Sequence, residues 1–297
     1  MSLPNSPPSY VGRFAPSPSG NLHFGSLITA LSSYLQARTE NGRWWLRVDD
    51  LDTPRNVPGA TAAIQRCLEA HALHWDSIYY QSEHIPDYLE NLQRLQAQRR
   101  VFACQCSRKT VLAAGGVYPG TCRDKQLPWQ GNALRLRNDS TSGQLNDALL
   151  GLIDSDDPMI NDDFILRRRD GIIGYHLASV TDDINMGVTQ VVRGADLLLP
   201  SICQLSLYKQ LDGTAPEMLH LPVACFADGR KLSKQNHAPE LKSQQAPLNL
   251  LEALRYLGQR PPSELLPCSA QAVIDWALAH WNPEAIPVKT EINLTSL

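Results

Sequence analysis

Residues 10–26 read YVGRFAPSPSGNLHFGS, and this stretch decides the fold. It predicts a short strand over residues 10–14, which ends in a turn rich in proline and glycine over residues 15–20. The next segment has the one-face spacing of an amphipathic helix, carried by Phe24, Leu27, Ile28, Leu31 and Leu35. Aromatic and branched side chains over residues 43–48 predict a second strand. Strand, helix and strand in this order form a βαβ unit, which implies parallel strands and a right-handed crossover.

The whole chain predicts an α/β protein with a Rossmann-type parallel sheet that is split by an inserted module. Further helices are predicted over residues 60–72, 87–98 and 202–211, and further strands over residues 189–192 and 219–227. Clustered cysteines, glycines and charges mark the insertion, and regular alternation returns over residues 172–180. The predicted parts are the first half of the α/β domain (1–103), an inserted module (104–170), the second half of that domain with a polar loop (171–245) and a short helical element (246–297).

The composition is that of an ordinary soluble protein. The chain has 297 residues, of which 43% are hydrophobic and 19% charged, and no apolar run is long enough to span a membrane. The first residues lack the pattern of a secretory signal, and seven unevenly spread cysteines do not suggest a disulfide framework, so a cytoplasmic location is expected. The net charge of −3 means that a nucleic-acid partner would have to use local basic clusters, such as residues 167–169, which are otherwise a solvated surface.

The turn before the first helix is suited to phosphate binding. Small residues let the backbone approach a ligand closely, and a helix start offers N–H groups and a positive dipole end. His23 can donate a hydrogen bond to a phosphate oxygen, while Gly25, followed by Ser26, leaves room for a purine or ribose. Taken alone, the segment is as well explained by an ordinary turn.

A polar, glycine-bounded loop over residues 228–236 carries Lys231 and Lys234 at i and i+3. Lysine is a compact charge suited to phosphate oxygens when negative charge builds up during displacement at a phosphorus atom. The alternative is a solvated charge pair, and the pairing with the first motif decides between them.

Together the two motifs resemble the signatures of class I aminoacyl-tRNA synthetases, with His23-Phe24-Gly25-Ser26 as the first and Lys231-Leu232-Ser233-Lys234-Gln235 as the second. The stretch from Gly12 to Gly20 resembles the glutamyl/glutaminyl branch, as do residues 175–178 and 192–196. The resemblance implies ATP as a substrate with Mg²⁺, contacts to ATP from the two motifs, and catalytic roles for His23 and Lys234.

Recognition of free glutamate requires cations for its carboxylates and an anion for its ammonium group. Arg13 and Arg193 stand at the ends of predicted parallel strands, where such sheets place their ligands. Asp49 follows the second predicted strand and is a candidate for the ammonium contact, and the Tyr175 hydroxyl can add a hydrogen bond. The resemblance implies glutamate contacts from Arg13, Ala15, Ser17, Tyr175 and Arg193, and Phe14 and Pro16 of the same turn complete the predicted glutamate site. The family has glutamate at position 49, whereas this chain has the shorter Asp49. Asp50 or a water is the alternative partner of the ammonium group, and a turn or helix cap is the alternative role for Asp49.

Three cysteines in one short window, Cys104, Cys106 and Cys122, suggest a zinc site. The fourth ligand is open between Tyr118 and Asp124 on chemical grounds, because no histidine lies between the first and last cysteine. The alternative is three cysteines without a metal. The four other cysteines, Cys67, Cys203, Cys225 and Cys268, fall in apolar patterns and are expected in the core.

The cysteine pattern resembles the zinc site of the glutamyl-queuosine tRNA(Asp) synthetases, short bacterial relatives of glutamyl-tRNA synthetase. In that family the tyrosine is the fourth ligand, which implies Tyr118 here and one structural zinc. The short segment after Lys234 agrees with these relatives, since it leaves no room for an anticodon-binding domain.

The resemblance implies tRNA-independent activation of L-glutamate and its transfer to queuosine in the anticodon of tRNA(Asp), by an enzyme expected to be a monomer. The alternatives are a truncated glutamyl-tRNA synthetase that charges a tRNA 3′ end, a non-catalytic tRNA-binding relative, and a small nucleotidyltransferase.

Overall fold

The computed structural model describes residues 10–139, 142–226, 228–232 and 239–294. Its first part is the predicted βαβ unit, which continues into a third strand. β1 (Val11–Phe14), β2 (Arg43–Val48) and β3 (Ser77–Tyr80) form a parallel sheet in that order, and α1 (Phe24–Thr39) connects the first two. The α/β class with a parallel sheet is confirmed.

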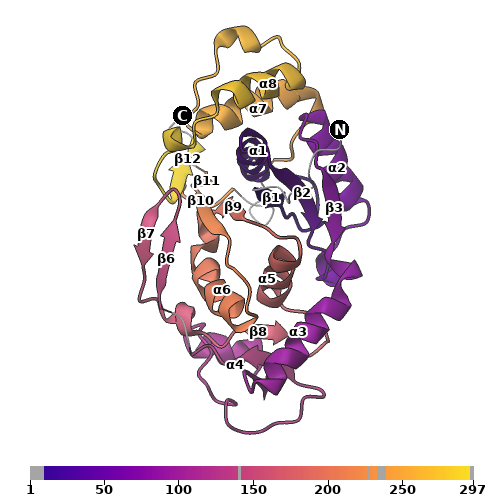
Figure 1. Cartoon of the computed structure of the whole chain (residues 1–297), viewed down its shortest axis with the longest axis vertical. Helices are drawn as coiled ribbons and strands as arrows, with labels where there is room; N and C mark the ends of the chain where they lie inside the picture. The colour runs from indigo at the N-terminus through magenta and orange to yellow at the C-terminus, as the bar shows by residue number, and fades with distance from the viewer. Residues whose placement is uncertain (1–9, 140–141, 227, 233–238, 295–297) are drawn as a thin grey trace, which may run out of the picture.

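Two later strands extend this parallel arrangement on the other side of β1. β9 (Gln190–Gly194) pairs in parallel with β10 (Glu217–Leu221). β9 lies beside β1 (Figure 1), and the backbone N–H of Thr189 donates to the carbonyl oxygen of Val11 at 2.9 Å. The carboxyl ends of strands from both parts of the chain therefore face the same edge.

The segment between these parts builds a second, antiparallel sheet. It consists of β4 (Val101–Cys104), β5 (Ala133–Leu136) and β8 (Ile165–Arg167) in that order. The same segment supplies a hairpin of β6 (Gln144–Asp147) and β7 (Gly151–Asp154), seen at the edge of the molecule in Figure 1. β6 joins the sheet of β9 and β10, because Asp147 pairs with Met218 of β10.

Helices cover these sheets. The remaining α-helices are α2 (Ala60–Ala70), α3 (Ile85–Ala97), α4 (Arg108–Ala113), α5 (Tyr175–Asn185), α6 (Leu198–Gln210), α7 (Ala246–Tyr256) and α8 (Ala270–His280). Short 3-10 helices span Thr53–Arg55, Gln81–Glu83, Pro158–Asn161, Ala195–Leu197, Ser243–Gln245, Ser263–Leu265 and Pro283–Ala285. In the described part of the chain, none of the helices has the length and apolar character needed to cross a membrane.

The strand predicted over residues 219–227 is wrong in its extent. It is interrupted at Pro222, which lacks a backbone N–H, and the chain continues as β11 (Val223–Cys225). β11 leaves the sheet of β9 and β10 and pairs in parallel with β12 (Glu291–Asn293), so residues 291–293 are held against the strand that precedes Lys231.

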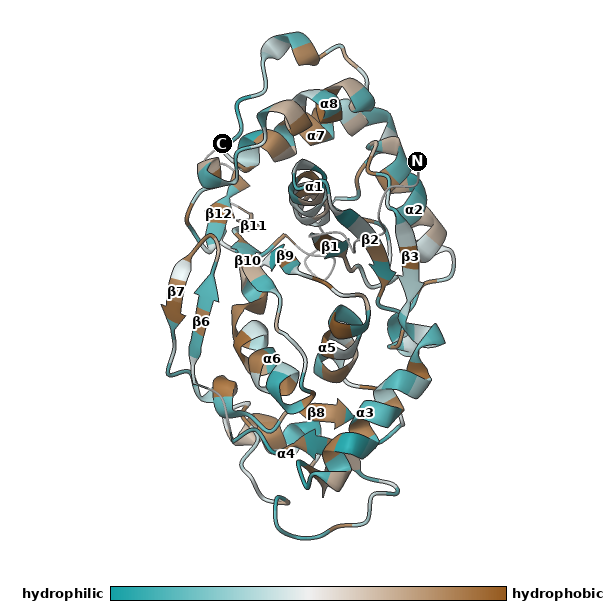
Figure 2. Ribbon diagram, in the orientation of Figure 1, coloured by the Kyte–Doolittle hydropathy of each residue, from teal (hydrophilic) through white to brown (hydrophobic). Residues whose placement is uncertain are grey.

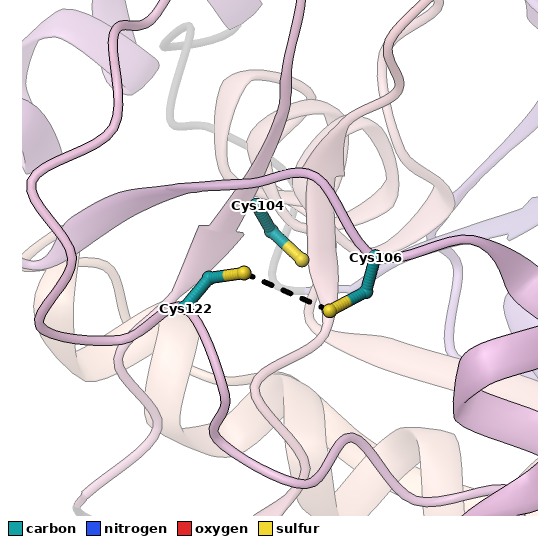
Figure 3. A group of neighbouring side chains, drawn as sticks. All are labelled: Cys104, Cys106 and Cys122. Carbon is teal, nitrogen blue, oxygen red and sulfur yellow. Dashed lines mark hydrogen bonds between the residues drawn. The ribbon is translucent and has the colours of Figure 1, made fainter.

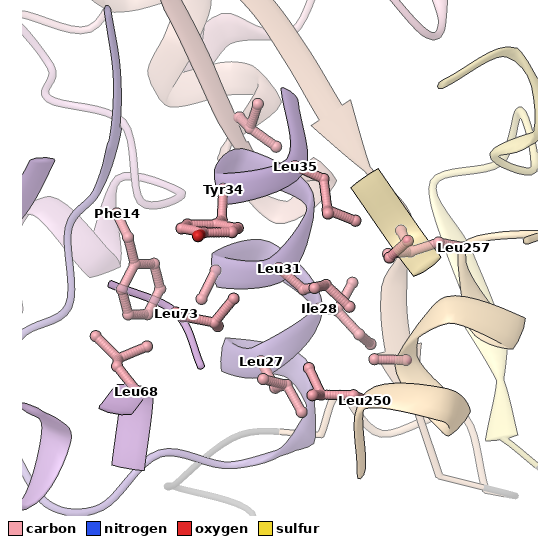
Figure 4. Close-up of a cluster of buried hydrophobic side chains, with 14 of the residues drawn as sticks. Phe14, Leu27, Ile28, Leu31, Tyr34, Leu35, Leu68, Leu73, Leu250 and Leu257 are labelled. Atoms are coloured by element: carbon pink, nitrogen blue, oxygen red, sulfur yellow. The ribbon is translucent and has the colours of Figure 1, made fainter. Parts of the chain in front are cut away.

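α1 lies at the centre of the main core. Its side chains Leu27, Leu31 and Leu35 are at most 1% exposed, and they pack with Phe14 of β1 and Leu250 of α7 (Figure 4). Fully burying one such leucine contributes about 1.5–3 kcal/mol. An outer helix such as α3 carries hydrophilic and hydrophobic residues along its length (Figure 2), as expected for an element with one buried face. The buried leucines of α1 hold this helix, and with it the start of the helix, against the sheet.

Candidate active site

A cavity of about 380 Å³ lies at the carboxyl ends of β1 and β9, beside the start of α1. Every residue predicted to bind glutamate lines it: Arg13, Phe14, Ala15, Pro16, Ser17, Asp49, Tyr175 and Arg193. The same cavity is lined by the predicted ATP residues His23, Gly25, Ser26 and Lys231. Lys234 lies outside the described residues. The structure therefore brings the two predicted substrate sites together, and the role of each residue stays a prediction.

His23 caps the first turn of α1. Its Nδ1 accepts a hydrogen bond from the backbone N–H of Ser26 at 3.3 Å, so the neutral imidazole carries its proton on Nε2. A Cβ atom on Gly25 would lie 3.2 Å from His23 Cε1 and 3.5 Å from the carbonyl oxygen of Leu232. A side chain at position 25 would crowd the histidine, which explains why a glycine stands in this turn.

Lys231 reaches the cavity from the lysine loop. Its ammonium forms an ion pair with Asp196, which also lines the cavity and lies just after β9. An isolated bridge between Cys225 and Lys231 ties the loop to the end of β11. The cationic group is therefore held beside the cavity by Asp196 and by the end of β11.

Three buried charged side chains are joined at one wall of the cavity. Arg13 Nε lies 3.1 Å from Asp183 Oδ1, and the same oxygen lies 2.7 Å from Arg47 Nη1. Burial acts to raise the pKa of Asp183, but Arg13 and Arg47 outweigh it and lower that pKa. Asp183 thus stays ionised and fixes both guanidinium groups at the cavity wall. Sequence reasoning missed Arg47 and Asp183; a charged residue inside the aromatic strand β2 was the available signal.

Arg193 is buried at the end of β9 and held on several sides. Its Nη1 lies 3.4 Å from the Tyr175 hydroxyl, its Nη2 donates to Gln204 Oε1 at 2.9 Å, and its Nε lies 3.3 Å from His220 Nε2. Tyr175 is 43% exposed, so its ring stands at the mouth of the cavity. The cavity wall carries three guanidinium groups, two carboxylates and a phenol, which together can bind a dicarboxylic amino acid.

The three cysteines predicted to bind zinc meet at the end of β4. The Sγ atoms of Cys104, Cys106 and Cys122 lie within 4.8 Å of one another, and the last two are 3.6 Å apart (Figure 3). Tetrahedral zinc with Zn–S bonds of about 2.3 Å requires sulfur atoms roughly 3.8 Å apart, so this arrangement fits the ion. Burial raises the pKa of the Cys106 thiol to about 11, so ionising this thiol costs free energy. A bound cation would offset that cost.

The structure separates the two candidates for the fourth ligand. The Tyr118 hydroxyl accepts a hydrogen bond from the backbone N–H of Cys122 at 2.7 Å, and the tyrosine is buried within this cluster. The Asp124 side chain is 89% exposed and pairs with Arg137 at 3.3 Å. The geometry therefore favours Tyr118.

Three of the four remaining cysteines are buried as predicted, and one is not. Cys67, Cys203 and Cys225 are buried, as predicted. Cys268 is only partly buried, because it lies in the loop before α8 rather than on a packed face. The prediction that it belongs to the core is wrong.

Comparison with known proteins agrees with this geometry. Residues 10–113 and 121–286 match the family model for the catalytic domain of class I tRNA synthetases (E and Q). The chain is 46% identical over 288 residues to the glutamyl-Q tRNA(Asp) synthetase of Pectobacterium atrosepticum, covering 97% of this chain and 89% of that protein. The protein of the same name from Salmonella typhi is 46% identical, with 96% of both chains covered.

Solved structures share the fold. The glutamate-tRNA synthetase from Elizabethkingia anophelis matches with a TM-score of 0.79 at 23% identity, over 96% of this chain and 68% of that one. A glutamate tRNA ligase from Elizabethkingia meningosepticum, solved in complex with its amino acid, gives a TM-score of 0.78 over 96% of this chain and 66% of that one. With its catalytic-domain match and its close relatives, this chain belongs to the glutamyl-Q tRNA(Asp) synthetase family of class I tRNA synthetases.

Proposed function

We propose that this chain uses ATP to activate L-glutamate without tRNA, and transfers the glutamyl group to queuosine in the anticodon of tRNA(Asp). The observation that carries the proposal is the single cavity in which Arg13 and Arg193 lie with His23 and Lys231. An amino acid and the phosphates of ATP are thereby brought within reach of each other. The names of the curated relatives supply the acceptor.

On the glutamate side, Arg13 and Arg193 bind the carboxylates, and the Tyr175 hydroxyl adds a hydrogen bond. Asp49 binds the ammonium group. The turn residues Phe14, Ala15, Pro16 and Ser17 line the same wall and shape it around the substrate.

On the nucleotide side, the start of α1 binds ATP through His23, Gly25 and Ser26. A glutamate carboxylate oxygen attacks the α-phosphorus, and pyrophosphate leaves with its Mg²⁺. His23, through its Nε2–H, and Lys231 stabilise the charge that develops on the phosphate oxygens, and we assign the same role to Lys234. A ring hydroxyl of queuosine then attacks the glutamyl carbonyl, which releases AMP and a proton.

One zinc ion would be held by Cys104, Cys106, Tyr118 and Cys122. It would fix the fold of the inserted module rather than act on substrate, because the ligands belong to the antiparallel sheet and its adjoining loops. We propose that the chain is divided into two catalytic halves (1–103 and 171–245), an inserted module (104–170) and a helical element (246–297). We also propose that the protein is a cytoplasmic monomer.

Glutamate-dependent exchange between ATP and pyrophosphate tests activation. The purified protein should catalyse exchange with glutamate, and much less with aspartate or glutamine, in the absence of tRNA. Labelled glutamate should then be transferred to tRNA(Asp) that contains queuosine and not to the same tRNA without it. Exchange that appears only after tRNA(Glu) is added would instead support a truncated glutamyl-tRNA synthetase, and its absence under all conditions would overturn the enzymatic proposal.

A further inference from the structure

A chain of buried contacts runs from the cavity wall into the inserted segment. Arg193 Nε lies 3.3 Å from His220 Nε2, and His220 Nδ1 lies 2.6 Å from Asp147 Oδ2. The His220 and Asp147 side chains are both 0% exposed, and the Ser201 hydroxyl lies 2.6 Å from His220 Nε2. Asp147 ends β6, whereas His220 and Arg193 lie on β10 and β9.

These polar contacts fix the protonation states of Asp147 and His220. Asp147 Oδ1 accepts backbone N–H groups from Leu149 and Leu150 at 3.0 and 2.9 Å, and Oδ2 accepts that of His220 at 3.1 Å. Burial acts to raise the pKa of Asp147, but these hydrogen bonds and His220 together lower it, so the carboxylate is ionised. It accepts a hydrogen bond from the His220 Nδ1–H, which leaves the Nε2 lone pair facing the Arg193 Nε–H and the Ser201 hydroxyl.

A neutral histidine is also what the neighbouring arginine requires. Burial lowers the pKa of His220, and Arg193 lowers it further, while Asp147 opposes the shift. A second cation beside Arg193 would repel it, whereas an Nε2 acceptor orients its Nε–H. Further contacts of the guanidinium group, among them those to Ser201, Gln204 and Tyr175, then present Arg193 to the cavity in one orientation.

We propose that Asp147 and His220 are positioning residues of the amino-acid site, which act on glutamate binding through Arg193. Neither is among the described residues that line the cavity, so any effect on glutamate passes through the arginine. Through the Asp147 carboxylate at the end of β6, the inserted segment thus supports Arg193 and with it the glutamate site. This inference rests on the proposed function, in which Arg193 binds a glutamate carboxylate.

Kinetics of glutamate-dependent pyrophosphate exchange by full-length variants test the inference. His220→Leu removes the acceptor, so KM for glutamate should rise roughly tenfold to hundredfold while KM for ATP stays within about twofold. His220→Gln places an amide oxygen near the position of Nε2 and should recover most of the loss. Asp147→Asn keeps the shape but removes the charge, and should raise KM for glutamate several-fold.

A second buried histidine provides the matched control. His71 is 0% exposed, and its nitrogens lie 2.6 Å from the carbonyl oxygen of Cys67 and 3.0 Å from Asn249 Nδ2, away from the cavity. His71→Leu should reduce thermal stability without changing either KM. If His220→Leu does not fold, the glutamine and asparagine variants decide.

The outcomes distinguish a failure of the positioning role from a failure of the proposed function. A wild-type protein without exchange activity contradicts the proposed function itself. An active wild type whose His220→Gln and Asp147→Asn variants keep a normal KM for glutamate, or whose KM values for glutamate and ATP rise together, overturns the positioning role. A selective rise for glutamate, absent in His71→Leu, establishes it.

Discussion

Arg47 and Asp49 are joined directly at the end of β2: Arg47 Nε lies 2.8 Å from Asp49 Oδ1, and their side chains are 1% and 11% exposed. Residues two positions apart in an extended chain point to the same face, so both reach the cavity. Arg47 also pairs with Asp183, which holds Arg13. One arginine therefore links the group proposed for the glutamate ammonium to a group proposed for a carboxylate.

Asp49→Asn should weaken glutamate binding selectively. The amide keeps the volume of the side chain but loses the charge that pairs with an ammonium, while Arg47 keeps its partner Asp183. We expect KM for glutamate in pyrophosphate exchange to rise roughly tenfold to hundredfold. Asp50→Asn is the matched control, because Asp50 accepts hydrogen bonds from Ser82 at 2.8 and 2.7 Å and does not belong to the described cavity wall. A larger effect at Asp50 would reassign the ammonium contact to it.

Two substitutions of His23 should separate its structural role from its catalytic role. Asparagine is a good N-cap and keeps an acceptor for the Ser26 N–H, but it does not extend a donor to the position of Nε2. His23→Asn should therefore retain stability and lose roughly 10²–10³ in the rate of adenylate formation. His23→Ala should lose the same activity and, in addition, about 1 kcal/mol of stability. Rapid-quench measurement and denaturant unfolding check the two parts, and an active His23→Asn would contradict a catalytic role.

Local patterns predicted the first βαβ unit well. Apolar periodicity and branched residues located α1 and β2, because both elements are defined by neighbours in the sequence and by one buried face. The β6–β7 hairpin was not predicted, since its strands are short and polar and its place is set by pairing with β10. The strand over residues 219–227 failed for a local reason, the break at Pro222.

The site residues likewise divide into those that local sequence could predict and those that it could not. Residues at strand ends, such as Arg13 and Arg193, could be predicted because parallel strands bring their carboxyl ends to one edge. The groups behind them could not, since a buried carboxylate such as Asp183 meets Arg47 across 136 positions of sequence and Asp147 meets His220 across 73. Spacing along the chain carries no signal for contacts of that range.

Purified protein should contain about one zinc ion per chain, and Cys122→Ser should lower its zinc content. Three thiolates and the Tyr118 oxygen supply four ligands, so Tyr118→Phe should also weaken binding, whereas Asp124→Asn should not. Elemental analysis and competition with a chelator measure both effects. Chelation should lower the melting temperature, because binding energy at a structural site is folding energy.

Cys203→Ser is the matched control for this experiment. Cys203 is equally buried, on α6, but its thiol donates to the carbonyl oxygen of Met159 rather than facing other sulfur atoms. Its zinc content should equal that of the wild type. Equal zinc content in Cys122→Ser would show that the cluster is not the metal site, and loss of zinc in Asp124→Asn alone would transfer the fourth ligand to the aspartate.

The pH dependence of stability should carry a contribution from His176. Its ring packs on Phe164 and Tyr175, and its buried Nδ1 has no hydrogen-bond partner among the described residues. Burial, reinforced by Arg193, lowers the pKa of His176 to about 4. The unfolded chain takes up this proton near pH 6.5 and the folded chain does so only near pH 4, so the unfolded state binds more protons between these values and stability falls as the pH is lowered.

His176→Phe removes the titrating group and keeps an aromatic ring in the same position. Relative to this variant, the wild type should lose roughly 2–3 kcal/mol of unfolding free energy between pH 6.5 and pH 4, and none of this difference should develop above pH 7. Denaturant unfolding of both proteins across this range measures it. Parallel pH profiles for the two proteins would mean that water reaches His176 and that its pKa is close to that of the unfolded chain.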